Sequence, residues 1–238
     1  MKQAIKADQA VALIPDGAVL MIGGFMAVGT PQRLIDALVA VGRKDLTVIA
    51  NDSARPGVGI GKLIDAQAVK RLIVSHIGTN PEAQRQMLSG ALNVELVPQG
   101  TLAERIRAAG FGLGGVLTRT GLGTLAAEGK PTVTVDGETW LIEKPLTADF
   151  ALINAKQADY LGNLDYSLTA QNFNPVMAMA AQTVIVDPDT TVPVGVIPPD
   201  QVKTPGILVD HHCLRAVREH RAVFGTKNPD RETRLVRA

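Results

Sequence analysis

The 238-residue sequence lacks several features that mark specialised classes of protein. Its only cysteine is Cys213, which excludes an intrachain disulfide and any cluster of cysteine ligands for a metal. The formal net charge is +1, so the chain has no strong field that would favour nucleic acid or another acidic surface as a partner. These absences leave an ordinary folded protein as the starting expectation.

The sequence also has no long apolar run. Lys6, Asp8 and Asp16 interrupt the apolar residues of the amino terminus, which therefore does not match a signal peptide. The uncharged stretch 17–32 is rich in glycine and shorter than the roughly 20 apolar residues that cross a bilayer. A second uncharged stretch, 166–186, contains polar side chains that would be costly to bury in lipid. We therefore expect no membrane span and a cytoplasmic location.

What the sequence does contain is the composition of a globular protein. Hydrophobic residues make up 46% of the chain and charged residues 20%. We find no internal repeat and no low-complexity linker, which predicts one domain over residues 1–210. Residues 211–238 are expected to form a basic tail that faces solvent or a partner. Three of the four histidines lie in this tail, and no clustering of metal ligands is apparent, so we expect no metal site.

Short apolar runs alternate with glycine-bearing loops and amphipathic segments, a pattern typical of α/β proteins. It predicts a mostly parallel sheet flanked by helices, with ligands bound beyond the carboxyl ends of the strands. An Asp136-Gly137 pair between two alternating runs predicts a hairpin that adds some antiparallel strands to this sheet. The expected strands are 18–22, 46–50, 72–75, 94–97, 150–154 and 183–186, and the expected helices are 32–41, 81–89 and 102–108.

The loop GGFMAVGTP, residues 23–31, lies between the first expected strand and helix. Its three glycines would let the backbone approach a ligand closely, and the amino end of the following helix would favour an anion such as phosphate. Thr30 is expected as the N-cap of that helix, with Pro31 at its first position. The alternative is a tight strand-to-helix turn without any ligand.

Two well-known phosphate loops do not fit the sequence. Gly24 and Gly29 have the spacing of GxxxxGK[ST], but Thr30 stands where the essential lysine would be. A GxGxxG pattern begins at Gly110, yet the residues before it read as a helix rather than a strand. Nucleotide hydrolysis and a nicotinamide cofactor are therefore disfavoured.

Polar residues follow the other expected strands. Asn51 follows the second strand, and Gln99 with Gly100 follows the fourth. A neutral amide at this edge could donate a hydrogen bond to a developing oxyanion, so these three residues are candidate oxyanion or substrate contacts. The alternative is that they are simple turn residues.

The acidic residues near the same edge have a structural interpretation. Glu82 follows Thr79, and Glu104 follows Thr101, at the spacing of a capping box. His76 lacks the neighbours of a catalytic triad. For these residues we therefore favour a structural role over a catalytic one.

Several segments together resemble one family. The stretch DGAVLMIGGFMAVGTP, residues 16–31, is similar to the signature of the A subunits of family I coenzyme A-transferases. The similarity continues through SHIGTNPE, LVPQGTLAERIR, LTRTGLGT and AQNFNP, up to about Asp210. Within the family, the sequence most resembles alpha subunits that act on acetate or acetoacetyl-CoA.

The resemblance implies a fold, an activity and a partner. The fold would be that of CoA-transferases, which sugar-phosphate isomerases share. The chain would help to move CoA from a short-chain or 3-oxoacyl thioester to a carboxylic acid such as acetate, with no tightly bound cofactor. The nucleophilic glutamate would come from a beta subunit, in a Ser-Glu-Asn-Gly setting that this chain lacks, so this chain would hold no catalytic residue of its own. The assembly would be a heterodimer or larger, such as α2β2. CoA-binding residues would be Gly23, Gly24, Phe25, Met26, Ala27, Val28 and Gly29.

The sequence also departs from the family pattern. Arg119 stands in a TRTG stretch where relatives show TPTG, and Ala109 precedes Gly110 where they show two glycines. Two rival functions stay open at this point. One is a non-catalytic module that binds acyl-CoA or another anion, and the other is a sugar-phosphate isomerase.

Overall fold

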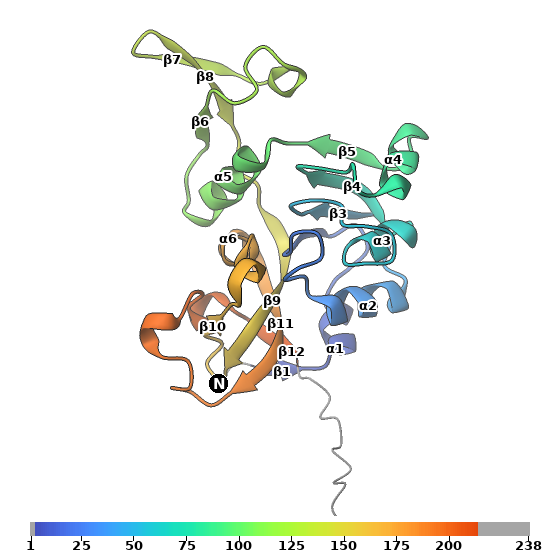
Figure 1. Cartoon of the computed structure of the whole chain (residues 1–238), viewed down its shortest axis with the longest axis vertical. Coiled ribbons are helices and arrows are strands. Elements are labelled where there is room, and N and C mark those ends of the chain that lie inside the picture. The colour runs from blue at the N-terminus through green and yellow to red at the C-terminus, as the bar shows by residue number, and fades with distance from the viewer. Residues whose placement is uncertain (1–2, 214–238) are drawn as a thin grey trace, which may run out of the picture.

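The structure is a computed structural model that describes residues 3–213. Its main feature is a nine-stranded sheet in which eight strands follow the order β1-β12-β11-β9-β2-β3-β4-β5 (Figure 1). All of these neighbours are parallel, and only the short β10 pairs with β9 in the antiparallel direction. The strands are β1 (Gln3–Ile5), β2 (Val19–Ile22), β3 (Leu46–Ile49), β4 (Val69–Val74), β5 (Asn93–Leu96), β9 (Ala148–Asp159), β10 (Leu164–Asp165), β11 (Ala181–Val192) and β12 (His211–Cys213). The predicted α/β fold with a mostly parallel sheet is confirmed.

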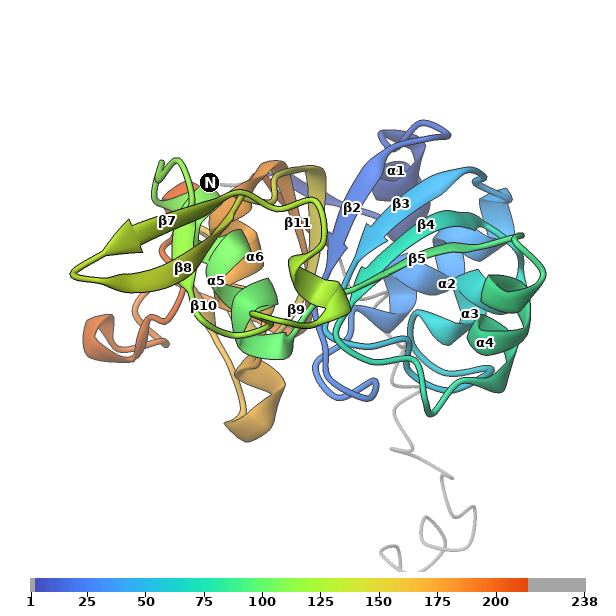
Figure 2. The ribbon, with the colours of Figure 1, turned by 90° about the horizontal axis from the view of Figure 1, so that it is seen from above.

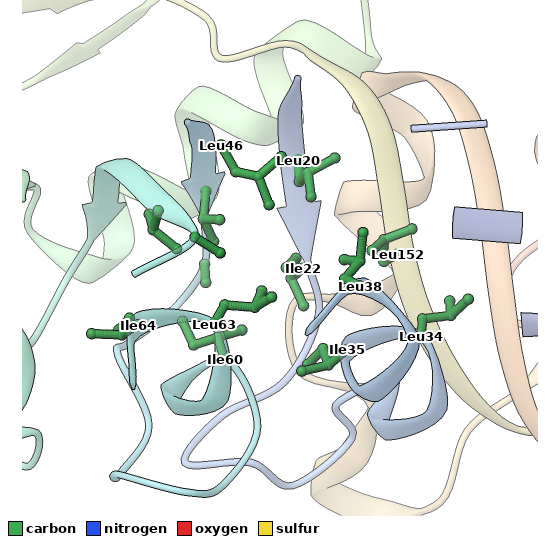
Figure 3. Packing of buried hydrophobic residues seen from close by; sticks show 14 of the residues in the cluster. Leu20, Ile22, Leu34, Ile35, Leu38, Leu46, Ile60, Leu63, Ile64 and Leu152 are labelled. Carbon is green, nitrogen blue, oxygen red and sulfur yellow. The ribbon is translucent and has the colours of Figure 1, made fainter. Parts of the chain in front are cut away.

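Helices cover both faces of this sheet and create two hydrophobic cores. Alternate residues of one strand point to opposite faces, so Leu20 and Ile22 of β2 enter one core while Met21 enters the other. Figure 3 shows Leu20 and Ile22 packed with Leu34 and Ile35 in the first core. This core is covered by α1 (Ala7–Ala12), α2 (Gln32–Val41), α3 (Gly61–Asp65) and α4 (Pro81–Leu88), and the second by α5 (Gln99–Gly110) and α6 (Asn174–Ala180).

A second, smaller sheet projects from the body beyond α5, and we call residues 116–143 the arm (Figures 1 and 2). It contains β6 (Val116–Thr118), β7 (Thr132–Val135) and β8 (Glu138–Glu143), paired antiparallel in the order β6-β8-β7. Asp136 and Gly137 join β7 to β8 with φ of 51° and 81°, as a two-residue hairpin turn requires. The hairpin prediction is confirmed, but its placement in the main sheet is wrong.

Ion pairs attach the base of the arm to α5. The buried carboxylate of Glu143 accepts a hydrogen bond from Lys130 at 2.6 Å and lies 3.7 Å from Nε of Arg105. Arg105 also donates to Glu95 on β5 at 3.0 Å and to the carbonyl of Lys144 at 2.8 Å. Through Arg105, α5 is held against both the main sheet and the arm.

The predicted helix caps differ from the observed ones. α2 begins after Pro31 and has no side-chain cap, so Thr30 is not its N-cap. α4 is capped by Asn80, whose side chain accepts a hydrogen bond from the backbone N–H of Ala83 at 3.0 Å. Thr79 is therefore not the cap, because an Asn directly before Pro81 combines a good capping side chain with a proline suited to the first turn.

The second predicted capping box is also wrong. α5 begins at Gln99, so Thr101 already lies inside the helix. Glu82 and Glu104 instead bind arginines three residues further along their own helices, Arg85 and Arg107. Both acids remain structural, although through ion pairs rather than caps.

Two observations complete the description of the fold. β12 (His211–Cys213) is part of the main sheet, although its residues fall in the segment expected as a tail. Residues 214–238 of that tail lie outside the described residues. Within residues 3–213, no helix combines the length and apolarity that crossing a membrane requires.

Candidate active site

The glycine loop, residues 23–29, leaves the carboxyl end of β2 and folds back on itself. Phe25 and Val28 exchange backbone hydrogen bonds of 3.0 and 2.8 Å across a tight turn. Met26 and Ala27 form this turn with φ of 49° and 72°, values that residues with a side chain rarely adopt. The turn presents the side chains of Phe25 and Val28 to solvent, where each is about half exposed.

Most backbone donors of the glycine loop are already bonded within the protein. The N–H of Gly23 donates to the carbonyl of Leu152 at 3.0 Å. The N–H of Gly24 donates to Oδ1 of Asn172 at 3.1 Å, and that of Met26 to Oδ2 of Asp52 at 2.9 Å. The loop is therefore held rigidly against three distant parts of the chain.

The glycines allow this segment to pack against the rest of the protein. A Cβ atom on Gly23 would lie 1.8 Å from Oδ1 of Asn174, and one on Gly29 would lie 2.4 Å from the carbonyl oxygen of Ala170. Gly24 has φ of +124°, and a Cβ there would lie 1.9 Å from Oγ1 of Thr30. The close approach that these glycines permit is to the chain's own atoms.

The amino end of α2 is also occupied from within the chain. The backbone N–H of Arg33 donates to Oδ2 of Asp187 at 3.1 Å, and the side-chain Nε of Arg33 donates to Oδ1 of Asp187 at 2.6 Å. Asp187 comes from β11, 154 positions away in the sequence. Burial raises the pKa of this carboxyl, and the neighbouring Arg33 opposes that shift. The sequence predicts that an anionic ligand binds at the amino end of α2, but the carboxyl group of Asp187 occupies this position.

A chain of hydrogen bonds connects the carboxyl edge of the sheet to the start of α5. Asp52 and Asn51 follow β3 and are both almost fully buried. Nδ2 of Asn51 donates to Oδ2 of Asp52 at 2.8 Å, and Oδ1 of Asn51 accepts from Nε2 of Gln99 at 2.6 Å. We call these three side chains the amide relay.

The amide relay opens into a pocket of about 310 Å³. Its lining joins one residue of the glycine loop to the predicted contacts Asn51, Gln99 and Gly100. These residues come from the loops after β2 and β3 and from the first turn of α5, which the parallel strands bring to one edge of the sheet. The full lining is Phe25, Asn51, Gln99, Gly100, Ala103, Asn172, Phe173 and Val176.

The other residues of the glycine loop lie away from this pocket. Gly23, Gly24 and Ala27 line a separate cavity of about 10 Å³ behind the loop. The Met26 sulfur lies 3.6 Å from Oγ1 of Thr79. Phe25 is therefore the member of the loop that faces the larger pocket.

The segment 172–176 is a part of the site that sequence reasoning missed. The motif AQNFNP, residues 170–175, stood out in the sequence only for its resemblance to a family. In the structure it supplies Asn172 and Phe173 to the pocket wall and Asn174 to the support of the glycine loop. A signal was present, because asparagines clustered in an apolar segment are costly to bury unless they are hydrogen-bonded.

A wider pocket of about 500 Å³ continues along α5 towards the arm. It shares Gly100 and Ala103 with the first pocket and extends to Leu117 and Thr118 on β6. Arg119 lies beside this region and donates to Glu138 of the arm at 2.8 Å. The two pockets adjoin at Gly100 and Ala103 of α5.

The pocket at the amide relay lacks a nucleophile of its own. Its lining contains neither an acid nor a histidine, serine or cysteine. Burial raises the pKa of the Cys213 thiol to about 12, so this group stays protonated and unreactive at neutral pH. Among residues 3–213, no three acidic, histidine or cysteine side chains are arranged to hold a metal ion. The pocket offers hydrogen-bond donors and apolar contact without a reactive group.

The fold and the site define a class of protein: an open parallel α/β domain with a pocket beyond the carboxyl ends of its strands. The family described as Coenzyme A transferase matches residues 4–211, and the chain belongs to this family. The resemblance seen in the sequence is therefore confirmed.

Relatives of known name support the same assignment. The chain is 55% identical over 204 residues to the acetate CoA-transferase subunit alpha of Escherichia coli K12, covering 86% of this chain and 93% of the relative. It is 49% identical over 207 residues to the acetoacetyl-CoA:acetate/butyrate CoA transferase alpha subunit of Clostridium acetobutylicum, covering 87% and 95%.

Solved structures show the same fold. An acyl-CoA transferase, YdiF, from Escherichia coli O157:H7 in a thioester complex with CoA superposes with a TM-score of 0.81 at 24% identity. The match covers 90% of this chain but only 47% of that protein. A variant of the decarboxylase AibA/AibB superposes with a TM-score of 0.76 at 30% identity, covering 90% of this chain and 84% of that one.

Proposed function

We propose that the chain is the alpha subunit of a CoA-transferase and forms half of an active site that a beta subunit completes. The observation that carries the proposal is a pocket with well-placed amide donors and no nucleophile. The names of the relatives, which are alpha subunits, support a second subunit as the source of the missing group. An α2β2 assembly and a cytoplasmic location are parts of the same proposal.

In this proposal the pocket holds the reacting carbonyl of a CoA thioester. A carboxylate of the beta subunit attacks that carbonyl, and negative charge develops on the carbonyl oxygen. Gln99 has a second N–H on Nε2 without a partner among residues 3–213, and this N–H donates to the developing oxyanion. Phe25, Phe173 and Val176 provide an apolar wall for the acyl chain or the neighbouring part of CoA.

The glycine loop takes part in CoA binding mainly through its exposed tip. Phe25 presents apolar surface to the pocket and Val28 exposes apolar surface at the same turn, whereas the donors of Gly23, Gly24 and Met26 are used inside the protein. We therefore propose that the loop contacts CoA by its side chains and that it does not bind phosphate in the manner of a nucleotide-binding loop.

The substrates are proposed from the relatives. Their names point to thioesters of acetate, butyrate or acetoacetate, with a short carboxylic acid as acceptor. A pocket of about 310 Å³ is at the small end of the range for ligand sites, which suits a short acyl chain.

Reconstitution tests the proposal. The chain is co-expressed with the reading frame that neighbours its own, and the purified complex is given acetoacetyl-CoA and acetate. We expect formation of acetyl-CoA and acetoacetate by the complex and no transfer by the lone chain. Transfer by the lone chain would contradict the half-site.

The same preparations, tested for other activities and for CoA binding, separate the rival functions. Release of CO2 instead of acyl exchange would favour a decarboxylase, the activity named for one structural neighbour. Tight CoA binding by a chain that never acquires a partner would favour a non-catalytic binding module. Conversion of a sugar phosphate would favour an isomerase, which would need an acid or base that the pocket does not contain.

A further inference from the structure

Asp52 lies at the inner end of the amide relay and contacts only hydrogen-bond donors. Its carboxylate accepts from the backbone N–H of Met26 at 2.9 Å, from that of Ala54 at 2.7 Å and from Nδ2 of Asn51 at 2.8 Å. Its exposed fraction is 5%, so solvent does not compete for these bonds. The carboxylate therefore acts as a fixed acceptor at the end of the relay.

A fixed acceptor determines the direction of every hydrogen bond further along the relay. An ionised carboxylate has no proton to donate, so Asn51 must turn its NH2 group towards Asp52. Oδ1 of Asn51 then points to Gln99, and Gln99 must approach it with Nε2. The nitrogen of Gln99, and not its oxygen, is thereby held at this position.

The direction matters because an amide side chain has two ends of opposite character. Nε2 of Gln99 carries a second N–H, which is a donor at the edge of the pocket. If the relay ran in the other direction, Oε1 would occupy this position and would repel an oxyanion. Because one buried carboxylate can only accept, it decides whether the pocket stabilises or opposes negative charge.

We propose that Asp52 is a positioning residue that sets the donor polarity of Gln99 through Asn51. The proposal rests on the function proposed above, because it assigns the origin of the oxyanion donor in that reaction. Asp52 does not line the pocket, and the relay connects it to Gln99, which does.

Asp52 also anchors two loops, and the experiment must separate this role from the relay. Its bonds to Met26 and Ala54 hold the glycine loop and the next loop along the sheet edge. Substitution of Asp52→Asn changes both roles, whereas Asn51→Ala cuts the relay and leaves both loop anchors in place. Both variants are therefore made in the assembled complex.

A double-mutant cycle with Gln99→Ala tests the proposal. We expect Asp52→Asn and Asn51→Ala each to lower kcat about tenfold, with a smaller change in KM for the thioester. In the Gln99→Ala background, each should lower kcat by less than about twofold, because the donor they orient is already gone. Losses that multiply with that of Gln99→Ala would overturn the proposal, since they would show that Asp52 and Asn51 act independently of Gln99.

The matched control is Asp65→Asn. Asp65 accepts from the backbone N–H of Gly57 at 2.6 Å and anchors the same neighbouring loop without contact to the relay. This variant should keep the wild-type kcat. A loss as large as that of Asp52→Asn would attribute the effect to the loop and overturn the proposal.

A readout without activity keeps this proposal distinct from the proposed function. Absence of CoA transfer by the wild-type complex would refute the proposed function. Whether or not the complex transfers CoA, its NMR spectrum reports on the relay through the side-chain NH2 signals of glutamine. The signals of Gln99 are assigned by comparison with the spectrum of Gln99→Ala. We expect Asp52→Asn to move the Gln99 signals and Asp65→Asn to leave them unchanged. Gln99 signals that Asp52→Asn does not move would overturn the relay.

Discussion

The glycine loop and the amide relay lie at the same edge of one sheet and use their polar groups in opposite ways. The loop donates its N–H groups to Leu152, Asn172 and Asp52, and its glycines admit atoms of the chain itself. The relay ends at Gln99, which has a second side-chain N–H with no partner among residues 3–213. The most conspicuous motif of a sequence can thus serve mainly to hold loops together, while a less conspicuous amide beside it is the proposed contact to the reacting group.

The largest effect is expected from adding a side chain at Gly23. A Cβ atom there would lie 1.8 Å from Oδ1 of Asn174, so Gly23→Val must displace a buried side chain. We expect a loss of about 3 kcal/mol or more in the free energy of unfolding, measured by urea denaturation. Gly57→Ala is the control, because nothing lies within 4 Å of its Cβ and only backbone strain of about 1–2 kcal/mol remains. Equal stability of Gly23→Val and wild type would show that the glycine loop does not serve to hold loops together.

This result bears on how a motif of this kind is tested. Gly24→Val is the obvious substitution for probing CoA binding, yet its Cβ would lie 1.9 Å from Oγ1 of Thr30. Loss of binding in that variant would report damage to the loop and not contact with CoA. A side chain at the exposed tip is the informative probe.

A second, smaller loss of stability is expected from Asn174→Ala. The buried amide of Asn174 accepts from the N–H of Asn154 and donates to the carbonyls of Gly29 and Ala170. Its removal leaves buried polar groups without partners, at a cost of about 2 kcal/mol in the free energy of unfolding. Asn172→Ala, on the more exposed side of the same segment, should cost less. The reverse order would contradict the support that we assign to Asn174.

Binding by the tip of the glycine loop is tested with Phe25→Ala. This ring is 47% exposed and lines the pocket, so we expect KM for the thioester to rise about tenfold while the protein stays folded. Phe111→Ala is the matched control, since Phe111 is similarly exposed but lies at the far end of α5. An unchanged KM in Phe25→Ala would remove the loop from the binding site.

The smallest effect is expected at Glu82, which lies outside both regions. Hydrogen bonds from Arg85 and Gln86 lower the pKa of Glu82 to about 2. Glu82→Gln should leave kcat unchanged, because this acid serves its own helix. Because the pKa of Glu82 in the folded protein lies below the ordinary value of 4.5, its ionised carboxylate stabilises the fold at pH values above 4.5. The Tm difference between wild type and variant should therefore shrink as the pH falls from 4.5 towards 2. A large loss of kcat would identify Glu82 as catalytic and contradict the half-site.

The local features of the fold could be predicted from the sequence. Apolar runs marked six strands of the main sheet, although β1, β10 and β12 were not predicted, and Asp136-Gly137 marked the hairpin. Parallel strands present their carboxyl ends at one edge of a sheet, and this rule alone is sufficient to group Asn51, Gln99 and Gly100.

The remaining features depend on contacts between distant parts of the chain. Asn172 meets Gly24 across 148 positions of sequence, and Asp187 meets Arg33 across 154. Periodicity gives the face of a strand but not its neighbour, which is why the arm was assigned to the main sheet. The occupied helix end and the amide relay could therefore be recognised only in the folded chain.

The most direct test of the central claim is the kcat of the reconstituted complex that carries Gln99→Ala. Gln99 is exposed and makes one hydrogen bond in the relay, so the variant should assemble and bind thioester normally. Loss of an oxyanion donor predicts a kcat about 100-fold below that of the wild type, with little change in KM. A kcat within about twofold of the wild type would show that the amide relay is not the part of the active site that this chain contributes.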